Sequence, residues 1–233
     1  AAIALLVRTM VGPFGELFEQ WQQIVILISI LSMLLGALAA IWQQNLKRLL
    51  AYSSIGHVGY ALVGLAAGSK EGITGIGVYM AIYLAMNVGT FCCVLSMRRQ
   101  GLMAEGIDDL AGLARNHPMM AAAMAVFMFS MAGIPPLAGF FGKLYVFLAA
   151  VNEGLYTLAI IGVLTSVVGA YYYLRIVKIM YFDEPADAFD KTAGREVGVI
   201  MTFAGLFTLL FFVLPSPIVN AATQAAAVLF AGG

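Results

Sequence analysis

Two ionisable side chains lie deep inside apolar stretches of the sequence, where a charge is costly and usually functional. Lys143 lies roughly midway along the apolar residues 118–151, too deep to reach a membrane surface comfortably. His57 lies about 15 Å along an apolar helix from the polar end of that helix, and a histidine titrates near neutrality. Both groups can load and release a proton as their partners change. Their types and depths predict a proton relay.

The helix that carries His57 has further polar residues that could support a relay. Ser53, His57 and Tyr60 share one face of this helix, whereas Ser54 lies on the side of Lys47. Lys47, at the polar end, is a candidate to support or gate the relay and equally a candidate interfacial anchor. A weaker polar stripe follows on the next apolar stretch, where we expect packing rather than relay, with Asn87 kept as a candidate: Tyr79, Tyr83, Asn87 and Thr90.

The apolar stretch around Lys143 cannot be one continuous helix. Four residues of the segment 133–139 disfavour a helix, namely Gly133, Pro135, Pro136 and Gly139, because proline removes a backbone donor and clashes with the preceding turn. We expect two half-helices with an unwound middle. Broken helices of this kind often mark ion sites in transporters.

Composition places these groups in a membrane protein. Of the 233 residues, 62% are hydrophobic and 10% charged, with a net charge of zero. This is too apolar for a soluble globule, and it lacks the basic patch that nucleic-acid binding needs. We therefore predict an all-α, polytopic transmembrane helix bundle.

Apolar runs of roughly 20 residues define the spans. The expected elements, in chain order, are a helix remnant at 1–12, spans at 24–42, 46–67 and 73–97, a broken span at 118–151, a span at 155–180, a final span at 197–214 and a short interfacial tail at 215–233. Counting 118–151 as one crossing gathers most basic residues on one face, namely Arg48, Arg98, Arg99, Arg115, Lys178, Lys191 and Arg195. The positive-inside rule places this face in the cytoplasm.

No residue pattern for redox or covalent chemistry accompanies the candidate relay. The adjacent Cys92 and Cys93 lack the spacing of a metal or iron–sulfur site, so we expect no metal, no redox centre and no catalytic nucleophile in this chain. All twelve carboxylates fall in loops or at span ends, so Lys143 and His57 have no obvious buried acidic partner. The chain is expected to move something rather than transform it.

Two segments resemble the antiporter-like subunits of respiratory complex I, NADH:quinone oxidoreductase. They are residues 45–60 (NLKRLLAYSSIGHVGY) and residues 130–143 (SMAGIPPLAGFFGK). Together with residues 171–175 (YYYLR) and a short C-terminus, they resemble the subunit N type in particular. The resemblance implies that residues 22–181 are the second of two inverted five-helix repeats, and that residues 1–12 end the last helix of a first repeat that is missing here.

The resemblance also implies a function and its setting. Lys143 matches the essential lysine of the second broken helix, and His57 and Lys47 match polar positions of the family. The implied protein translocates protons, driven by redox chemistry in other subunits, with NAD, FMN, iron–sulfur clusters and quinone bound in or between those subunits. Implied partners are other membrane subunits of complex I, the lipid bilayer and protons.

Three alternatives remain open from the sequence. Multisubunit sodium/proton antiporters and membrane-bound hydrogenases share the first two motifs, and a non-conducting membrane scaffold would need no relay. The composition, rich in alanine and glycine, favours a bacterial inner membrane over a mitochondrial one.

Overall fold

The computed structural model describes residues 1–190 and 194–231, so Lys191 lies outside the described residues. The elements, in chain order, are α1 (Ala2–Val11), η1 (Gly15–Leu17), α2 (Phe18–Ile41), α3 (Leu46–Ala67), α4 (Lys70–Ser96), β1 (Arg98–Arg99), β2 (Leu102–Met103), η2 (Asp108–Leu110), α5 (Leu113–Asn116), α6 (Pro118–Ala132), α7 (Ala138–Asn152), α8 (Tyr156–Phe182), α9 (Arg195–Leu210) and α10 (Ser216–Ala231). Helices therefore dominate the chain.

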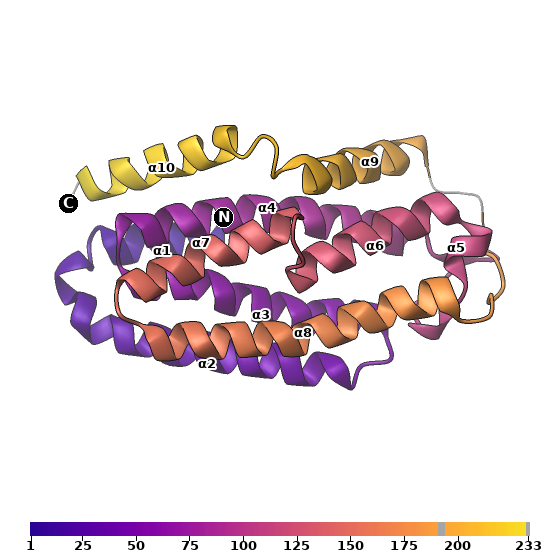
Figure 1. Cartoon of the computed structure of the whole chain (residues 1–233), viewed down its shortest axis with the longest axis horizontal. Helices are drawn as coiled ribbons and strands as arrows, with labels where there is room; N and C mark the ends of the chain where they lie inside the picture. The colour runs from indigo at the N-terminus through magenta and orange to yellow at the C-terminus, as the bar shows by residue number, and fades with distance from the viewer. Residues whose placement is uncertain (191–193, 232–233) are drawn as a thin grey trace.

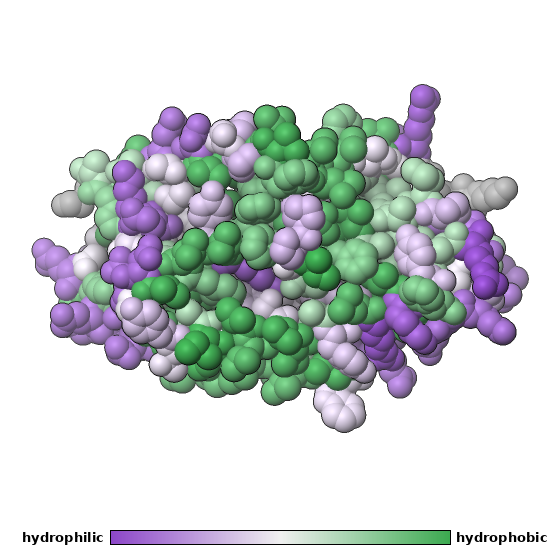
Figure 2. Space-filling model, viewed as in Figure 1, coloured by the Kyte–Doolittle hydropathy of each residue, from purple (hydrophilic) through white to green (hydrophobic). Residues whose placement is uncertain are grey.

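The long helices run along one axis of the bundle, and the loops gather at its two ends (Figure 1). Among the residues that the structure describes, four helical segments are long and apolar enough to cross a membrane: η1 with α2, then α3, α4 and α8. On the face shown in Figure 2, hydrophobic residues fill the middle and hydrophilic residues gather at both ends. The predicted all-α membrane bundle is confirmed.

Helices α6 and α7 lie in line and together run the length of the bundle (Figure 1). Helix α6 begins with Pro118, where a missing backbone donor costs nothing, and it ends at Gly133 in the left-handed conformation with φ of 89°. The unwound segment is residues 133–137, shorter than the predicted 133–139, since Gly139 already lies in the first turn of α7. Residues 118–151 thus form two half-helices in line, interrupted at residues 133–137.

The C-terminal part differs from the expectation. Helix α9 ends at Leu210 rather than near residue 214, and residues 216–231 form α10. Both helices lie along α4, one after the other (Figure 1). Pro217 permits this because it lies in the first turn of α10, where its missing N–H needs no partner.

Small residues bring α2 and α3 into close backbone contact. A Cβ atom on Gly36 would overlap the backbone of Gly56, and one on Gly59 would press on Met33. The Ser29 hydroxyl of α2 donates to the Gly59 carbonyl at 2.7 Å. These contacts fix the position of α3, the helix that carries His57.

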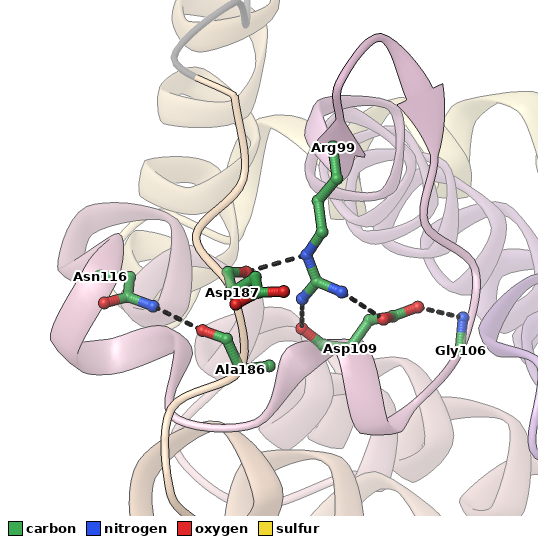
Figure 3. A network of polar contacts seen from close by, with 6 residues as sticks. All are labelled: Arg99, Gly106, Asp109, Asn116, Ala186 and Asp187. Atoms are coloured by element: carbon green, nitrogen blue, oxygen red, sulfur yellow. Dashed lines mark hydrogen bonds and ion pairs between the residues drawn. The ribbon is translucent and has the colours of Figure 1, made fainter.

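A polar network ties together the loops at the basic end of the bundle (Figure 3). The loop after α4 contains the antiparallel hairpin β1–β2, then η2 and α5. Arg99 pairs with the Asp109 carboxylate at 2.6 Å and donates to the Asp187 carbonyl at 2.8 Å. The Asn116 amide donates to the Ala186 carbonyl at 3.0 Å. The segment after α8 is thereby fastened to the loop after α4.

Candidate proton-relay site

Lys143 lies in the second turn of α7 with its side chain directed at the helix break. The side chain is 93% buried. Its Nζ donates three hydrogen bonds: to the carbonyls of Met131 and Ala132, at 2.9 and 3.0 Å, and to the Ser166 hydroxyl on α8, at 2.7 Å. All three N–H donors of an ammonium group are therefore satisfied inside the bundle.

The two prolines explain why those carbonyls are available. In an uninterrupted helix the carbonyls of Met131 and Ala132 would accept from the N–H groups four residues later, which belong to Pro135 and Pro136. Proline has no N–H, so both carbonyls lack a helical partner and Lys143 replaces it. The Pro135–Pro136 pair therefore leaves two carbonyls without helical partners, and Lys143 binds both of them.

Electrostatics of the break favour a cation at Nζ. The carbonyl end of a helix carries a partial negative charge, and Nζ lies against that end of α6. The face of the Tyr60 ring also attracts this cation, because the ring centroid lies 5.1 Å from Nζ. Within residues 1–190 and 194–231 no carboxylate pairs with Lys143. Peptide dipoles supply the counter-charge for which the sequence offered no acidic residue.

A second contact fixes the geometry of the break. The Gly139 N–H at the start of α7 donates to the Ser130 hydroxyl of α6 at 2.9 Å. A Cβ atom at position 139 would overlap the Ser130 carbonyl. Only glycine therefore lets the two half-helices approach closely enough to form this bond.

His57 has both ring nitrogens engaged. Nδ1 lies 2.7 Å from the Tyr79 hydroxyl on α4, and Nε2 lies 3.0 Å from the Tyr173 hydroxyl on α8. The Tyr173 hydroxyl is also hydrogen-bonded to Ser53 Oγ on α3. The imidazole stacks on the Tyr83 ring, with 4.6 Å between centroids, and the residue is 97% buried.

Tyr60 lies between the two predicted relay groups. Its ring contacts the His57 ring edge-on, with 6.0 Å between the centroids, and it also faces Lys143 Nζ. Its hydroxyl donates to Thr165 on α8 at 3.4 Å, next to Ser166. The structure thus brings Lys143 and His57 to the ring of Tyr60, whereas Ser53 meets His57 through the Tyr173 hydroxyl.

Three other sequence candidates lie apart from this cluster. Lys47 is half-buried at the basic end of the bundle, in an ion pair with Glu105 at 2.6 Å. Hydrogen bonds from Lys47 and then from Asn45 lower the pKa of the Glu105 carboxyl. Ser54 bonds to the Ala51 carbonyl one turn back. Asn87 is half-buried on α4, and within the described residues its side chain makes no hydrogen bond.

The tyrosines of α8 and α4 have a larger role than the sequence indicated. Tyr171 is exposed, as is typical of a tyrosine in an aromatic belt at a membrane surface. Tyr172 and Tyr173, however, are 96% and 98% buried. Tyr79, which was expected to pack, contacts His57 through its hydroxyl. A buried tyrosine hydroxyl needs a hydrogen-bond partner.

Ser166 was not singled out from the sequence. It lies seven residues before Tyr173 on α8, a spacing that places both side chains on one helix face. Extending the face analysis from Tyr173 along α8 would have found it.

The fold and this site define a class of protein: a polytopic α-helical membrane protein in which a buried lysine binds a broken helix, as in ion-transporting bundles. The family described as NADH:quinone oxidoreductase/Mrp antiporter, TM matches residues 1–169. The chain belongs to that family.

Curated relatives and solved structures agree with the family. NADH-quinone oxidoreductase subunit N of Paramagnetospirillum magneticum is 62% identical over 230 residues, 99% of this chain and 47% of the relative. Subunit N of Rhodospirillum rubrum is 63% identical over 226 residues, 97% of this chain and 46% of the relative. The chain thus spans about half the length of the curated relatives it matches, and it is of the subunit N type.

Two solved structures share the fold. A chain of respiratory complex I from Thermus thermophilus with bound aureothin is 32% identical, with a TM-score of 0.76 over 86% of this chain and 45% of that chain. A chain of the Mrp complex from Dietzia sp. is 22% identical, with a TM-score of 0.87 over 98% of this chain and 51% of that chain. The second likeness concerns the fold alone.

Proposed function

We propose that this chain is part of a proton-translocating membrane subunit of NADH:quinone oxidoreductase. Redox chemistry in other subunits would drive protonation changes at Lys143 and His57. The names of the similar relatives support the assignment to an oxidoreductase complex. Other membrane subunits of that complex are the proposed partners, and NAD, FMN, iron–sulfur clusters and quinone are assigned to other subunits or their interfaces.

One observation carries the proposal. The Lys143 ammonium is buried at the break between two half-helices, where every acceptor is a carbonyl or hydroxyl and none is a carboxylate. Such a site holds a cation without a fixed negative charge, so neutral and charged lysine can both occupy it. A buried carboxylate beside Lys143 would instead favour the charged form at all times.

Lys143→Gln in the full-length protein within its complex tests this proposal, because glutamine retains N–H donors for the freed carbonyls but cannot carry the proton. We expect fewer protons translocated per NADH oxidised, in a complex that still assembles. Lys178→Gln is the matched control, since Lys178 is exposed and pairs with Asp183 at 2.6 Å. Normal translocation in Lys143→Gln would show that the relay is wrong. Loss of assembly in both Lys143→Gln and Lys143→Arg would favour a non-conducting scaffold.

A sodium/proton antiporter subunit is the second candidate, because the matching family covers Mrp antiporters as well. Measuring translocation with and without sodium separates the two: a dependence on sodium favours the antiporter. The bacterial relatives support placing the protein in a bacterial inner membrane.

A further inference from the structure

Four buried polar groups form a continuous hydrogen-bonded file through the middle of the bundle. The file runs from the Tyr79 hydroxyl to His57 Nδ1, across the imidazole to Nε2, then to the Tyr173 hydroxyl and to Ser53 Oγ. The four residues come from three helices, α4, α3 and α8, and each is at least 95% buried. Nothing but imidazole and hydroxyl groups makes up the file.

The two ends of the file face different parts of the molecule. The Tyr79 ring packs against Gly142, the residue before Lys143 on α7. At the other end, Ser53 lies one turn nearer than His57 to the start of α3, which is the basic end of the bundle. His57 therefore separates a side near Lys143 from a side directed at the basic end.

Counting protons shows that the file has two states. Neutral imidazole carries one N–H and each hydroxyl carries one O–H. With the proton on Nδ1, His57 donates to Tyr79 and accepts from Tyr173 at Nε2. With the proton on Nε2, His57 donates to Tyr173, which donates to Ser53, and Tyr79 donates to Nδ1. Each tautomer thus fixes the direction of every O–H in the file.

We propose that Tyr173 is the proton-carrying residue through which His57 exchanges protons with the basic end of the bundle. In one step, the Tyr79 hydroxyl gives its proton to Nδ1 as a water molecule on the side of Lys143 gives one to the Tyr79 oxygen. Nε2 then passes its proton to Tyr173, Tyr173 passes its own to Ser53, and Ser53 gives its own to a water molecule on the side of the basic end. One proton enters, one leaves, and His57 changes from the Nε2–H to the Nδ1–H tautomer. This inference rests on the proposed function.

Tyr173→Phe in the full-length protein within its complex tests the inference, because it removes one oxygen atom and keeps the ring. We expect loss of this subunit's share of the protons translocated per NADH oxidised, with NADH oxidation retained when an uncoupler removes the membrane potential. Tyr171→Phe is the matched control: it removes the same atom from an exposed tyrosine of the same helix, whose hydroxyl is outside the file. It should translocate as the unmodified protein does.

Ser53→Ala provides a second, smaller change at the end of the file, and it should show the same loss. If the complex with Tyr173→Phe does not assemble, the Ser53→Ala variant provides the test of the inference. Normal translocation in either Tyr173→Phe or Ser53→Ala overturns the inference, as does an equal loss in Tyr171→Phe. Normal translocation in Tyr173→Phe together with impaired translocation in Lys143→Gln would refute the role of this file but not the proposed function. Normal translocation in Lys143→Gln would refute the proposed function itself.

Discussion

Replacing Gly139 by alanine should damage the helix break without changing any of the proposed relay side chains. The added Cβ would overlap the Ser130 carbonyl, so the start of α7 must move away from α6. Overpacking of a buried contact costs about 1–3 kcal/mol. Losing the 2.9 Å bond from the Gly139 N–H to the Ser130 hydroxyl costs about 1 kcal/mol more. The expected destabilisation is therefore roughly 2–4 kcal/mol.

The assay is the temperature at which half of the full-length protein, purified in its complex, remains assembled on a native gel. Gly198→Ala is the control, because Gly198 lies in α9 with no atom within 4 Å of its would-be Cβ. Glycine to alanine in an open helical position stabilises by roughly 0.5–1 kcal/mol. Gly139→Ala should thus melt lower, and Gly198→Ala no lower, than the unmodified complex. Equal midpoints for the two variants would refute the argument from close contact.

Two further predictions concern other parts of the bundle. Gly36→Ala should lower the same midpoint, since its Cβ would overlap the Gly56 backbone and separate α2 from α3; an unchanged midpoint would contradict the close packing. Glu105→Gln should melt lower than the unmodified complex at neutral pH, because the bond from Lys47 lowers the pKa of the Glu105 carboxyl and so stabilises the folded state above its unfolded pKa. That difference should disappear as the pH falls through the lowered pKa, and a difference that persists in acid would argue against the ion pair.

Much of the fold follows from sequence because its determinants are local. Asn45 and Gly68 bound α3 at the predicted residues, the first as a side-chain cap and the second through a φ of 67°. Gly133 and the two prolines located the helix break in the same way. In the C-terminal part, Pro215 and Pro217 indicate only where a helix is interrupted. Whether the chain then turns away or continues in line depends on packing against α4.

The candidate site was only partly predictable for the same reason. The depth of Lys143 and His57 could be read from hydropathy, and both are buried. Their partners could not, because Ser166 and Tyr173 lie on α8, 23 and 116 residues away along the chain. The partner of Lys47 was also not predictable, because Glu105 belongs to a loop that no sequence periodicity describes.

The close contact between α2 and α3 also bears on how quickly a proton could move. Because Gly36 and Gly56 bring the two backbones together without intervening side chains, α3 has little room to slide or tilt, and the position of His57 is set by its backbone. Helix displacements take microseconds to milliseconds, whereas side-chain torsions take picoseconds to nanoseconds. In such a bundle the fast variable is the rotation of hydroxyl groups around a stationary imidazole. The slow process is the one that changes the charge of Lys143.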